Sequence, residues 1–105
     1  MKVTIITVTY NSERYLDQCI RSVINQSHPD IEHIIVDGGS SDSTLSIIEK
    51  NKEHISKWVS EKDNGLYHAL QKGFLRSTGD IMGWLNSDDI LQICISFLKL
   101  LIPFL

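Results

Sequence analysis

Residues 2–9 read Lys-Val-Thr-Ile-Ile-Thr-Val-Thr, a run rich in β-branched side chains and apolar at its centre. Such a run is typical of a strand that is buried on both faces, as strands are in a parallel sheet. Strand-like and helix-like segments then alternate along the chain with short connections between them. This alternation predicts βαβ units with right-handed crossovers. The sequence therefore predicts an α/β fold, an open and mostly parallel sheet with flanking helices.

The remaining elements follow from the same pattern. Further strands are expected at residues 31–37, 56–60 and 81–85. Three helices are expected: one after Ser12, one from Ser41 or Asp42 to about Lys52, and one over residues 66–76. Asn11 or Ser12 is expected to cap the first helix, because short polar side chains accept hydrogen bonds from the unpaired N–H groups of a first turn. Helical spacing of apolar residues predicts the buried faces. These are Tyr15, Leu16, Cys19, Ile20, Val23 and Ile24 in the first helix, and Leu66, Ala69, Leu70 and Phe74 in the third.

Size and composition describe an ordinary soluble domain. The 105 residues fit one small domain, with 42% apolar and 22% charged residues. A formal net charge of -3 gives no basic footprint, so nucleic acid is not an expected partner. Cys19 and Cys94 lack metal-ligand spacing, which favours a reduced, cytoplasmic setting. The start of the chain resembles no signal peptide.

Polar clusters occur where each predicted strand ends. They are Thr9-Tyr10-Asn11, Asp37 to Ser41, Glu61 to Gly65, and Asn86 to Asp89. In open α/β sheets, ligands bind in the crevice beyond the carboxyl ends of the strands. Four clusters at strand exits therefore predict one binding site.

Alternatives exist for each cluster. Asp88 and Asp89 suit a hard cation such as Mg²⁺ or Mn²⁺, but Ser87 or Asp88 can equally cap a following helix. The stretch at 37–40 can be a simple turn, and the stretch at 61–63 a solvated charge cluster. The histidines at 28, 33, 54 and 68 show no ligand spacing and are interpreted as non-catalytic. Core or pocket-wall positions are expected for the aromatic residues Trp58, Tyr67 and Trp84.

An ordered set of motifs resembles family 2 glycosyltransferases. The set comprises Thr7-Val8-Thr9-Tyr10-Asn11, Val36-Asp37-Gly38-Gly39-Ser40-Ser41-Asp42-Ser43-Thr44, Ser60-Glu61-Lys62-Asp63-Asn64-Gly65 with Tyr67, Ala69 and Lys72-Gly73, Gly79-Asp80, and Trp84-Leu85-Asn86-Ser87-Asp88-Asp89. One such motif is weak, but their order and spacing match from Lys2 to about Leu91.

The resemblance implies an A-type glycosyltransferase fold (GT-A) that transfers sugar from a nucleotide-activated donor with inversion and with a divalent cation, Mg²⁺ or Mn²⁺. A uridine diphosphate sugar is the expected donor class, and cell-envelope polysaccharide biosynthesis the expected setting. The residues implied in nucleotide binding are Thr9, Tyr10, Asn11, Asp37, Gly38, Asp63, Gly65 and Asp88. Asp88 is the implied metal ligand, with Asp89 as an alternative. Neutral Asn86 stands where the family has its first acidic residue, so weaker metal affinity is our hypothesis.

Residues 1–91 are expected to form the nucleotide-sugar-binding domain, an incomplete GT-A unit, and residues 92–105 an apolar, helical tail. No acidic residue follows Asp89, so the general base that an inverting transfer needs is expected in an absent half. The alternative is an inactive, truncated nucleotide-binding or interaction module, and a second rival is a nucleotidyltransferase. The tail is too short for a spanning helix and is expected to cover the sheet, with self-association or contact with the inner face of the membrane as alternatives. The acceptor is not predicted.

Overall fold

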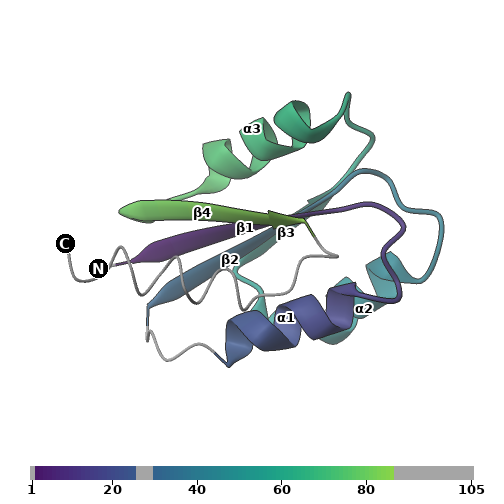
Figure 1. The fold of residues 1–105 in the computed structure, drawn as a ribbon, viewed down its shortest axis with the longest axis horizontal. Helices are drawn as coiled ribbons and strands as arrows, with labels where there is room; N and C mark the ends of the chain where they lie inside the picture. Colours follow the sequence, from purple (N-terminus) through teal and green to yellow (C-terminus); the bar gives the residue numbers. More distant parts are fainter. Residues whose placement is uncertain (1, 26–29, 87–105) are drawn as a thin grey trace.

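The computed structural model describes residues 2–25 and 30–86. Its strands are β1 (Val3–Thr9), β2 (Ile31–Asp37), β3 (Lys57–Ser60) and β4 (Ile81–Asn86), and its helices are α1 (Leu16–Ile24), α2 (Thr44–Lys50), the short 3₁₀ turn η1 (Lys52–His54) and α3 (Leu66–Arg76). The strands form one parallel sheet in the order β3-β2-β1-β4. Helix α3 covers one face of this sheet, and α1 and α2 cover the other (Figure 1). The predicted α/β sheet with flanking helices is confirmed.

The central strand β1 is buried along its whole length, as its β-branched sequence predicts. It pairs with β2 on one side and β4 on the other. Thr9 is opposite Asp37, and Val8 is opposite Asn86. This register brings the carboxyl ends of three strands to one edge of the sheet.

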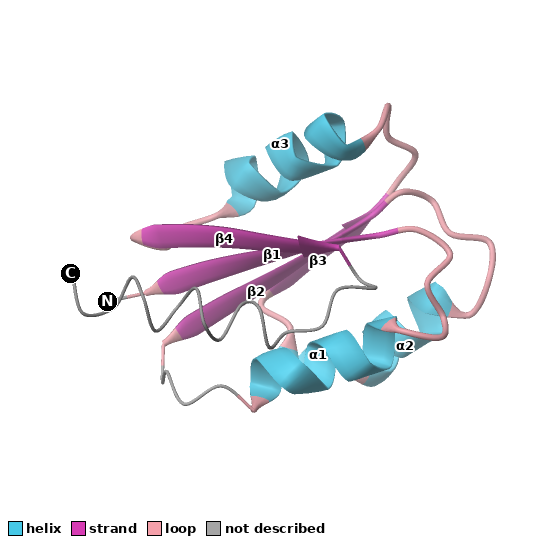
Figure 2. Ribbon diagram, viewed as in Figure 1, coloured by secondary structure: helices cyan, strands magenta, loops and turns pink. Residues whose placement is uncertain are grey.

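The helices lie on both sides of the sheet (Figure 2), and an apolar layer holds them on each side. Alternate residues of a strand point to opposite faces, so neighbouring strand positions feed different layers. One layer joins Ile6, Val8, Ile34 and Val36 to Ala69 of α3. The other joins Val3, Ile5 and Ile35 to Leu16, Cys19, Ile20 and Val23 of α1 and Ile48 of α2.

The predicted cap of the first helix is wrong. Helix α1 begins at Leu16, its N-cap residue is Tyr15, and no side chain caps it. Ser12 Oγ donates instead to the Tyr10 carbonyl, and Asn11 has a φ of 47°, which leaves the chain in a loop before the helix begins. The second helix begins at Thr44 rather than at Ser41 or Asp42, and its N-cap residue is Ser43, although Asp42 accepts a hydrogen bond from the Thr44 N–H.

The predicted buried face of α3 is also partly wrong. Leu66 and Phe74 are 39% and 58% exposed, whereas Ala69, Lys72 and Gly73 are buried. The reason is a close approach between α3 and β1. A Cβ atom added to Gly73 would lie 2.6 Å from Ile6 Cγ2, so the helix contacts the sheet through its smallest residue rather than its largest.

The three aromatic residues expected in a core or pocket wall are exposed, Tyr67 by 87%, Trp84 by 46% and Trp58 by 40%. The core interpretation is therefore wrong for them, although Tyr67 and Trp84 do line an apolar groove between α3 and β4. Cys19 is buried, and His28 and Cys94 lie outside the described residues. Within residues 2–25 and 30–86, none of the helices has the length and apolar character needed to cross a membrane.

The amino edge of the sheet is held by buried polar groups. Glu32 accepts hydrogen bonds from Thr4 Oγ1 at 2.9 Å, from the Thr78 N–H at 2.8 Å and from Thr78 Oγ1 at 2.7 Å. Lys57 Nζ lies 3.6 Å from Glu32 Oε2 and donates to the Arg76 carbonyl at 2.6 Å. These contacts fasten the start of β4 and the end of α3 to the middle of the sheet.

Candidate functional site

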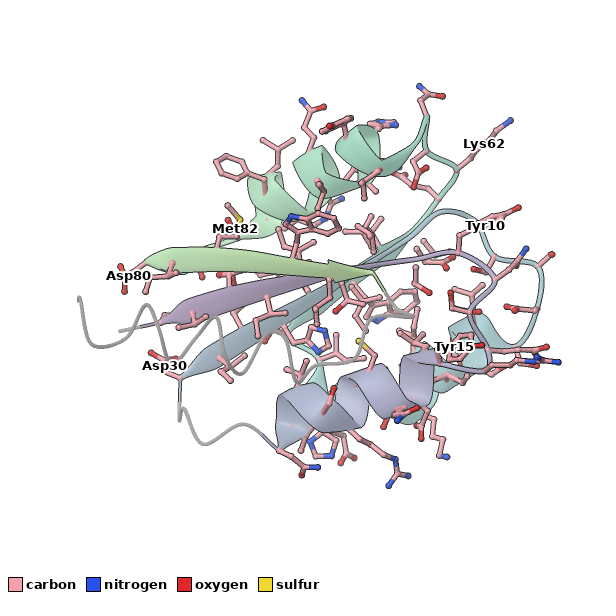
Figure 3. The ribbon with its side chains drawn as sticks, in the orientation of Figure 1. Tyr10, Tyr15, Asp30, Lys62, Asp80 and Met82 are labelled. Atoms are coloured by element: carbon pink, nitrogen blue, oxygen red, sulfur yellow. The ribbon has the colours of Figure 1, made fainter. Side chains whose placement is uncertain are left out.

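Three loops emerge at the carboxyl edge of the sheet. They connect β1 to α1, β2 to α2, and β3 to α3. Figure 3 shows Tyr10 and Lys62, from the first and third of these loops, at one end of the molecule, and Asp30 and Asp80 at the other. The loops that carry three of the four predicted polar clusters therefore meet at one end, as the strand-exit rule predicts.

A cavity of about 600 Å³ lies among the first and third loops and the start of α3. That volume falls within the range of small-molecule sites, roughly 300 to 1,000 Å³. Five of the eight residues expected to bind nucleotide line it: Thr9, Tyr10, Asn11, Asp63 and Gly65. Val8, Ser12, Tyr15, Leu66 and Ala69 complete the wall.

Asp37 does not line this cavity, because its side chain is fully buried among the loops. Its Oδ2 atom accepts hydrogen bonds from the Ser40 N–H at 2.9 Å, the Gly39 N–H at 3.1 Å and Ser60 Oγ at 2.7 Å. Its Oδ1 atom accepts from Ser40 Oγ at 2.5 Å. A carboxylate with this many donors joins the second loop to the end of β3. Its expected contact with a nucleotide base stays a prediction.

Asn11 ties the first loop to the second. Its N–H donates to Ser40 Oγ at 2.8 Å, and its side-chain Oδ1 accepts from the Ser41 N–H at 2.9 Å. The φ of 47° lies in the left-handed region, which asparagine tolerates better than most residues. Because Asn11 both donates to and accepts from the second loop, these two hydrogen bonds hold it in place at the cavity wall.

Asp63 presents a carboxylate between the second and third loops. Its Oδ1 atom accepts from the Gly65 N–H at 3.1 Å. A Cβ atom added to Gly38 would lie 2.9 Å from Asp63 Oδ2 and 3.5 Å from Tyr10 Cδ1. Gly38 therefore lies next to Asp63 and Tyr10 of the cavity wall without lining the cavity itself, and its expected contact with the nucleotide stays a prediction. Its lack of a side chain leaves room for the carboxylate.

Thr9 lines the cavity and has a buried side-chain hydroxyl. Its side chain is 5% exposed, and Oγ1 has no hydrogen-bond partner within residues 2–25 and 30–86. A buried hydroxyl without a partner is costly and uncommon, so such atoms are often found where a ligand or water binds.

Sequence reasoning missed several residues of the site. Tyr15 was assigned to the apolar stripe of the first helix, but it is 48% exposed and lines the cavity. Ser40 and Ser60, which hold Asp37, carry no distinctive pattern of their own. Their positions in the quoted motifs are the signal that was available.

The expected cation ligands, Asp88 and Asp89, lie outside the described residues. Among the residues that the structure does describe, no three histidine, cysteine or acidic side chains are grouped to hold a metal ion. Asp63 is the carboxylate that lines the cavity. The backbone of β4 runs to the same edge, since Asn86 pairs with Val8. The metal site therefore stays a prediction.

Comparison with known proteins identifies the family. The sequence model described as glycosyl transferase family 2 matches residues 4–100. The chain belongs to this family. TuaG of Bacillus subtilis, named for teichuronic acid biosynthesis, is 39% identical over 90 residues, covering 83% of this chain and 36% of TuaG. The cholesterol galactosyltransferase of Borreliella burgdorferi is 36% identical over 93 residues, covering 87% of this chain and 26% of that enzyme.

Solved structures of glycosyltransferases share the fold. Residues 1–349 of Staphylococcus aureus TarS in complex with UDP-GlcNAc match with a TM-score of 0.77 and 27% identity, over 94% of this chain and 31% of that fragment. The mannosyltransferase PcManGT of Pyrobaculum calidifontis, in complex with GDP-Man and Mn²⁺, matches with a TM-score of 0.77 and 28% identity, over 83% of this chain and 27% of that protein. The GT-A resemblance is thereby confirmed. The chain spans 36% of the length of TuaG and 26% of the length of the cholesterol galactosyltransferase.

Proposed function

We propose that this chain binds the nucleotide of a sugar nucleotide in the cavity at the carboxyl edge, and that it forms the donor-binding part of an inverting, cation-assisted glycosyltransferase. The observation that carries this proposal is the convergence of Thr9, Tyr10, Asn11, Asp63 and Gly65 on one cavity of about 600 Å³. These residues come from loops far apart in the sequence, and a ligand-sized cavity at a strand exit is the expected site in an open α/β sheet.

The cavity offers chemistry suited to a nucleoside. Tyr10 and Tyr15 are 62% and 48% exposed and line it, so their rings are available for stacking against a base. Stacking of a base on an aromatic side chain contributes about 1–3 kcal/mol. The Asp63 carboxylate can accept hydrogen bonds from base or ribose, and Thr9 Oγ1 has unused hydrogen-bonding capacity. A uridine diphosphate sugar is the proposed donor, supported by the likeness to TarS.

A divalent cation, Mg²⁺ or Mn²⁺, would neutralise the charge that develops on the nucleoside diphosphate as it leaves. Asp88, with Asp89 as the alternative ligand, is proposed to hold it. The likeness to PcManGT, whose complex contains Mn²⁺, supports a divalent ion in general.

We place the activity in cell-envelope polysaccharide synthesis, on the cytoplasmic side of the membrane or peripheral to it. The similarity to TuaG, which is named for teichuronic acid biosynthesis, supports the polysaccharide setting. A net charge of -3 is unfavourable for nucleic acid binding.

Nucleotide binding is tested by calorimetric titration of the chain with UDP and with GDP in the presence of Mn²⁺. We expect UDP to bind, and Asp63→Asn to weaken it by about tenfold, or 1.4 kcal/mol. Asp80→Asn is the matched control, since Asp80 lies at the amino edge, where its Oδ2 accepts from the Lys2 N–H. Equal losses in both variants, or no binding by the unmodified chain, would contradict the proposal.

A binding module without turnover is the second candidate. The observation that favours it is that the chain spans only 36% of the length of TuaG and 26% of the length of the cholesterol galactosyltransferase. Hydrolysis of UDP-GlcNAc with Mn²⁺ separates the two. Turnover above the rate without protein supports the transferase, and nucleotide binding without turnover supports the module.

A further inference from the structure

Lys72 is a cation in an unusual place. It lies on α3, about one turn after Ala69 of the cavity wall, and its side chain is only 9% exposed. Its Nζ atom donates to the Lys62 carbonyl at 3.1 Å and lies 3.2 Å from Glu61 Oε1. Lysine is rarely buried unless it is paired. Here both partners belong to the loop between β3 and α3, the loop that carries Asp63.

The same loop is held from its other side by the loop after β2. A Cβ atom added to Gly38 would lie 2.9 Å from Asp63 Oδ2. A Cβ atom added to Gly39 would lie 3.5 Å from the backbone nitrogen of Lys62. The Glu61 N–H donates to the Asp37 carbonyl at 3.0 Å. The stretch from 61 to 63 is thus held between two neighbours, a glycine pair and the Lys72 ammonium.

Stability alone does not explain a lysine at this position. Taking a charge out of water is expensive, and replacing a buried ion pair by apolar side chains is often neutral or stabilising. Glu61, the acidic partner, is 55% exposed, which screens its attraction for the ammonium. What the ammonium does provide is a directional contact that fixes the Lys62 carbonyl, one residue before Asp63.

We infer that Lys72 is a positioning residue for nucleotide binding, holding the β3–α3 loop so that the Asp63 carboxylate stands at the wall of the cavity. The expected effect on UDP affinity rests on the proposed function. The effect on the order of the β3–α3 loop does not, because that order can be measured without ligand.

The test compares Lys72→Met with Lys57→Met. Lys57 is a matched control because its Nζ also pairs with an acidic side chain and donates to a backbone carbonyl, but at the amino edge. Backbone order parameters of residues 62–65 are measured by ¹⁵N relaxation without ligand, and UDP affinity is measured by calorimetry with Mn²⁺. In Lys72→Met we expect these order parameters to fall toward about 0.6, below which a backbone is considered flexible. We expect UDP to bind about tenfold more weakly, as when an outer-shell partner of a binding group is removed.

The thermal midpoint of Lys72→Met should stay close to that of the unmodified chain, which a merely structural lysine would not allow. Lys57→Met should change neither loop order nor UDP affinity, and Lys72→Arg should restore both. Combining Lys72→Met with Asp63→Asn should cost little more UDP affinity than Asp63→Asn alone, because both changes act through one carboxylate.

Unchanged order at residues 62–65 in a folded Lys72→Met variant overturns the inference, and so does additive loss in the double variant. If the unmodified chain does not bind UDP, the proposed function fails and the order parameters still decide the positioning role. If Lys72→Met does not fold, Lys72→Gln replaces it. That shorter, uncharged side chain removes the ammonium from the Lys62 carbonyl, so it should reduce order in the same loop, and no reduction overturns the inference.

Discussion

At the scale of single residues, Asp37 joins two parts of the site through buried hydrogen bonds. Its carboxylate is buried and accepts hydrogen bonds from Gly39, Ser40 and Ser60. Sequence alone places an acidic residue at the end of a strand and suggests contact with a base. The structure shows that this position also needs a hydrogen-bond acceptor, because the loop after β2 and the end of β3 both donate to this carboxylate.

Asp37→Asn should therefore destabilise the fold. The amide keeps the shape but replaces an acceptor oxygen with a donor, so buried N–H and hydroxyl groups lose their partner. We expect a loss of about 3 kcal/mol in the free energy of unfolding, measured by urea denaturation. Glu49→Gln, an exposed change on α2, is the control. A loss no larger than that of the control would contradict the role given to Asp37.

Two buried titratable groups predict how stability depends on pH. Burial acts to raise the pKa of Glu32, but hydrogen bonds from Thr78 and Thr4 outweigh it and lower the pKa from 4.5 to about 2. Burial lowers the pKa of His33 from 6.5 to about 4. In both cases the folded pKa lies below the unfolded one. The stability from each group is therefore complete above its unfolded pKa and is lost as pH falls toward the folded value.

Free energies of unfolding measured by urea denaturation across pH should show two windows of loss, the first between pH 6.5 and about 4 from His33 and the second between pH 4.5 and about 2 from Glu32. Glu32→Gln should flatten the second window and leave the first. His33→Gln should do the reverse, so each variant is the control for the other. An unchanged lower window in Glu32→Gln would contradict the assignment.

At the scale of elements, the loop after β2 uses its two glycines for different reasons. Gly38 needs space, because a Cβ there would meet Asp63 Oδ2 at 2.9 Å, the end of a flexible side chain. Position 39 favours glycine because its φ is +89°, which other residues rarely adopt. Space is not the reason, since no atom lies within 3.4 Å of an added Cβ atom.

Substituting each glycine should therefore have a different effect. Gly38→Ala should move the Asp63 carboxylate and weaken UDP binding by about fivefold, roughly 1 kcal/mol, with little change in stability. Gly39→Ala should cost about 1 kcal/mol of stability through backbone strain. For both variants, calorimetry measures the affinity for UDP, and urea denaturation measures the free energy of unfolding. The same pattern in the two variants would contradict the distinction.

Helix α3 gives a second test at this scale. Alanine in place of glycine inside a helix ordinarily stabilises it by about 1 kcal/mol. Gly73→Ala should instead destabilise the protein by about 2 kcal/mol, because overpacking forces α3 away from Ile6 on β1. Urea denaturation decides the sign, with Gln71→Ala on the exposed side of the same helix as control. A stabilised Gly73→Ala would show that the contact is not close.

The elements themselves were largely predictable, and the reasons are physical. β1 and β2 are buried on both faces, which β-branched runs signal directly. The boundaries of α3 were also predicted, but its buried face was not, because the helix meets the sheet through Gly73 and buries Lys72 against the β3–α3 loop. Apolar spacing has no means of marking a contact made by a glycine and a paired lysine.

The candidate site was predictable in its location more than in its detail. Parallel strands bring their carboxyl ends together, so convergence of the loops follows from topology. Which carboxylate faces the cavity and which is buried depends on hydrogen bonds to Ser40 and Ser60. These are contacts between loops, and no pattern within one loop encodes them.

At the scale of the whole molecule, the two edges of the sheet have different tasks. The amino edge is fastened by Glu32 and its hydrogen-bond donors, and the carboxyl edge carries the cavity. Helix α3 reaches both, since Leu66 lines the cavity and the Arg76 carbonyl accepts from Lys57 at the other end. Changes at the amino edge should alter stability with little effect on binding.

The most direct test of the nucleotide site is an NMR titration of the ¹⁵N-labelled chain with UDP and Mg²⁺, which unlike Mn²⁺ is not paramagnetic. We predict saturable shifts of backbone resonances at residues 9–11, at Gly38 and at residues 63–65, which flank or line the cavity. Resonances of Thr4, Glu32 and Thr78 at the amino edge should stay in place. Shifts centred on the amino edge or on the apolar groove between α3 and β4, or no saturable shift at all, would contradict a nucleotide site at the carboxyl edge.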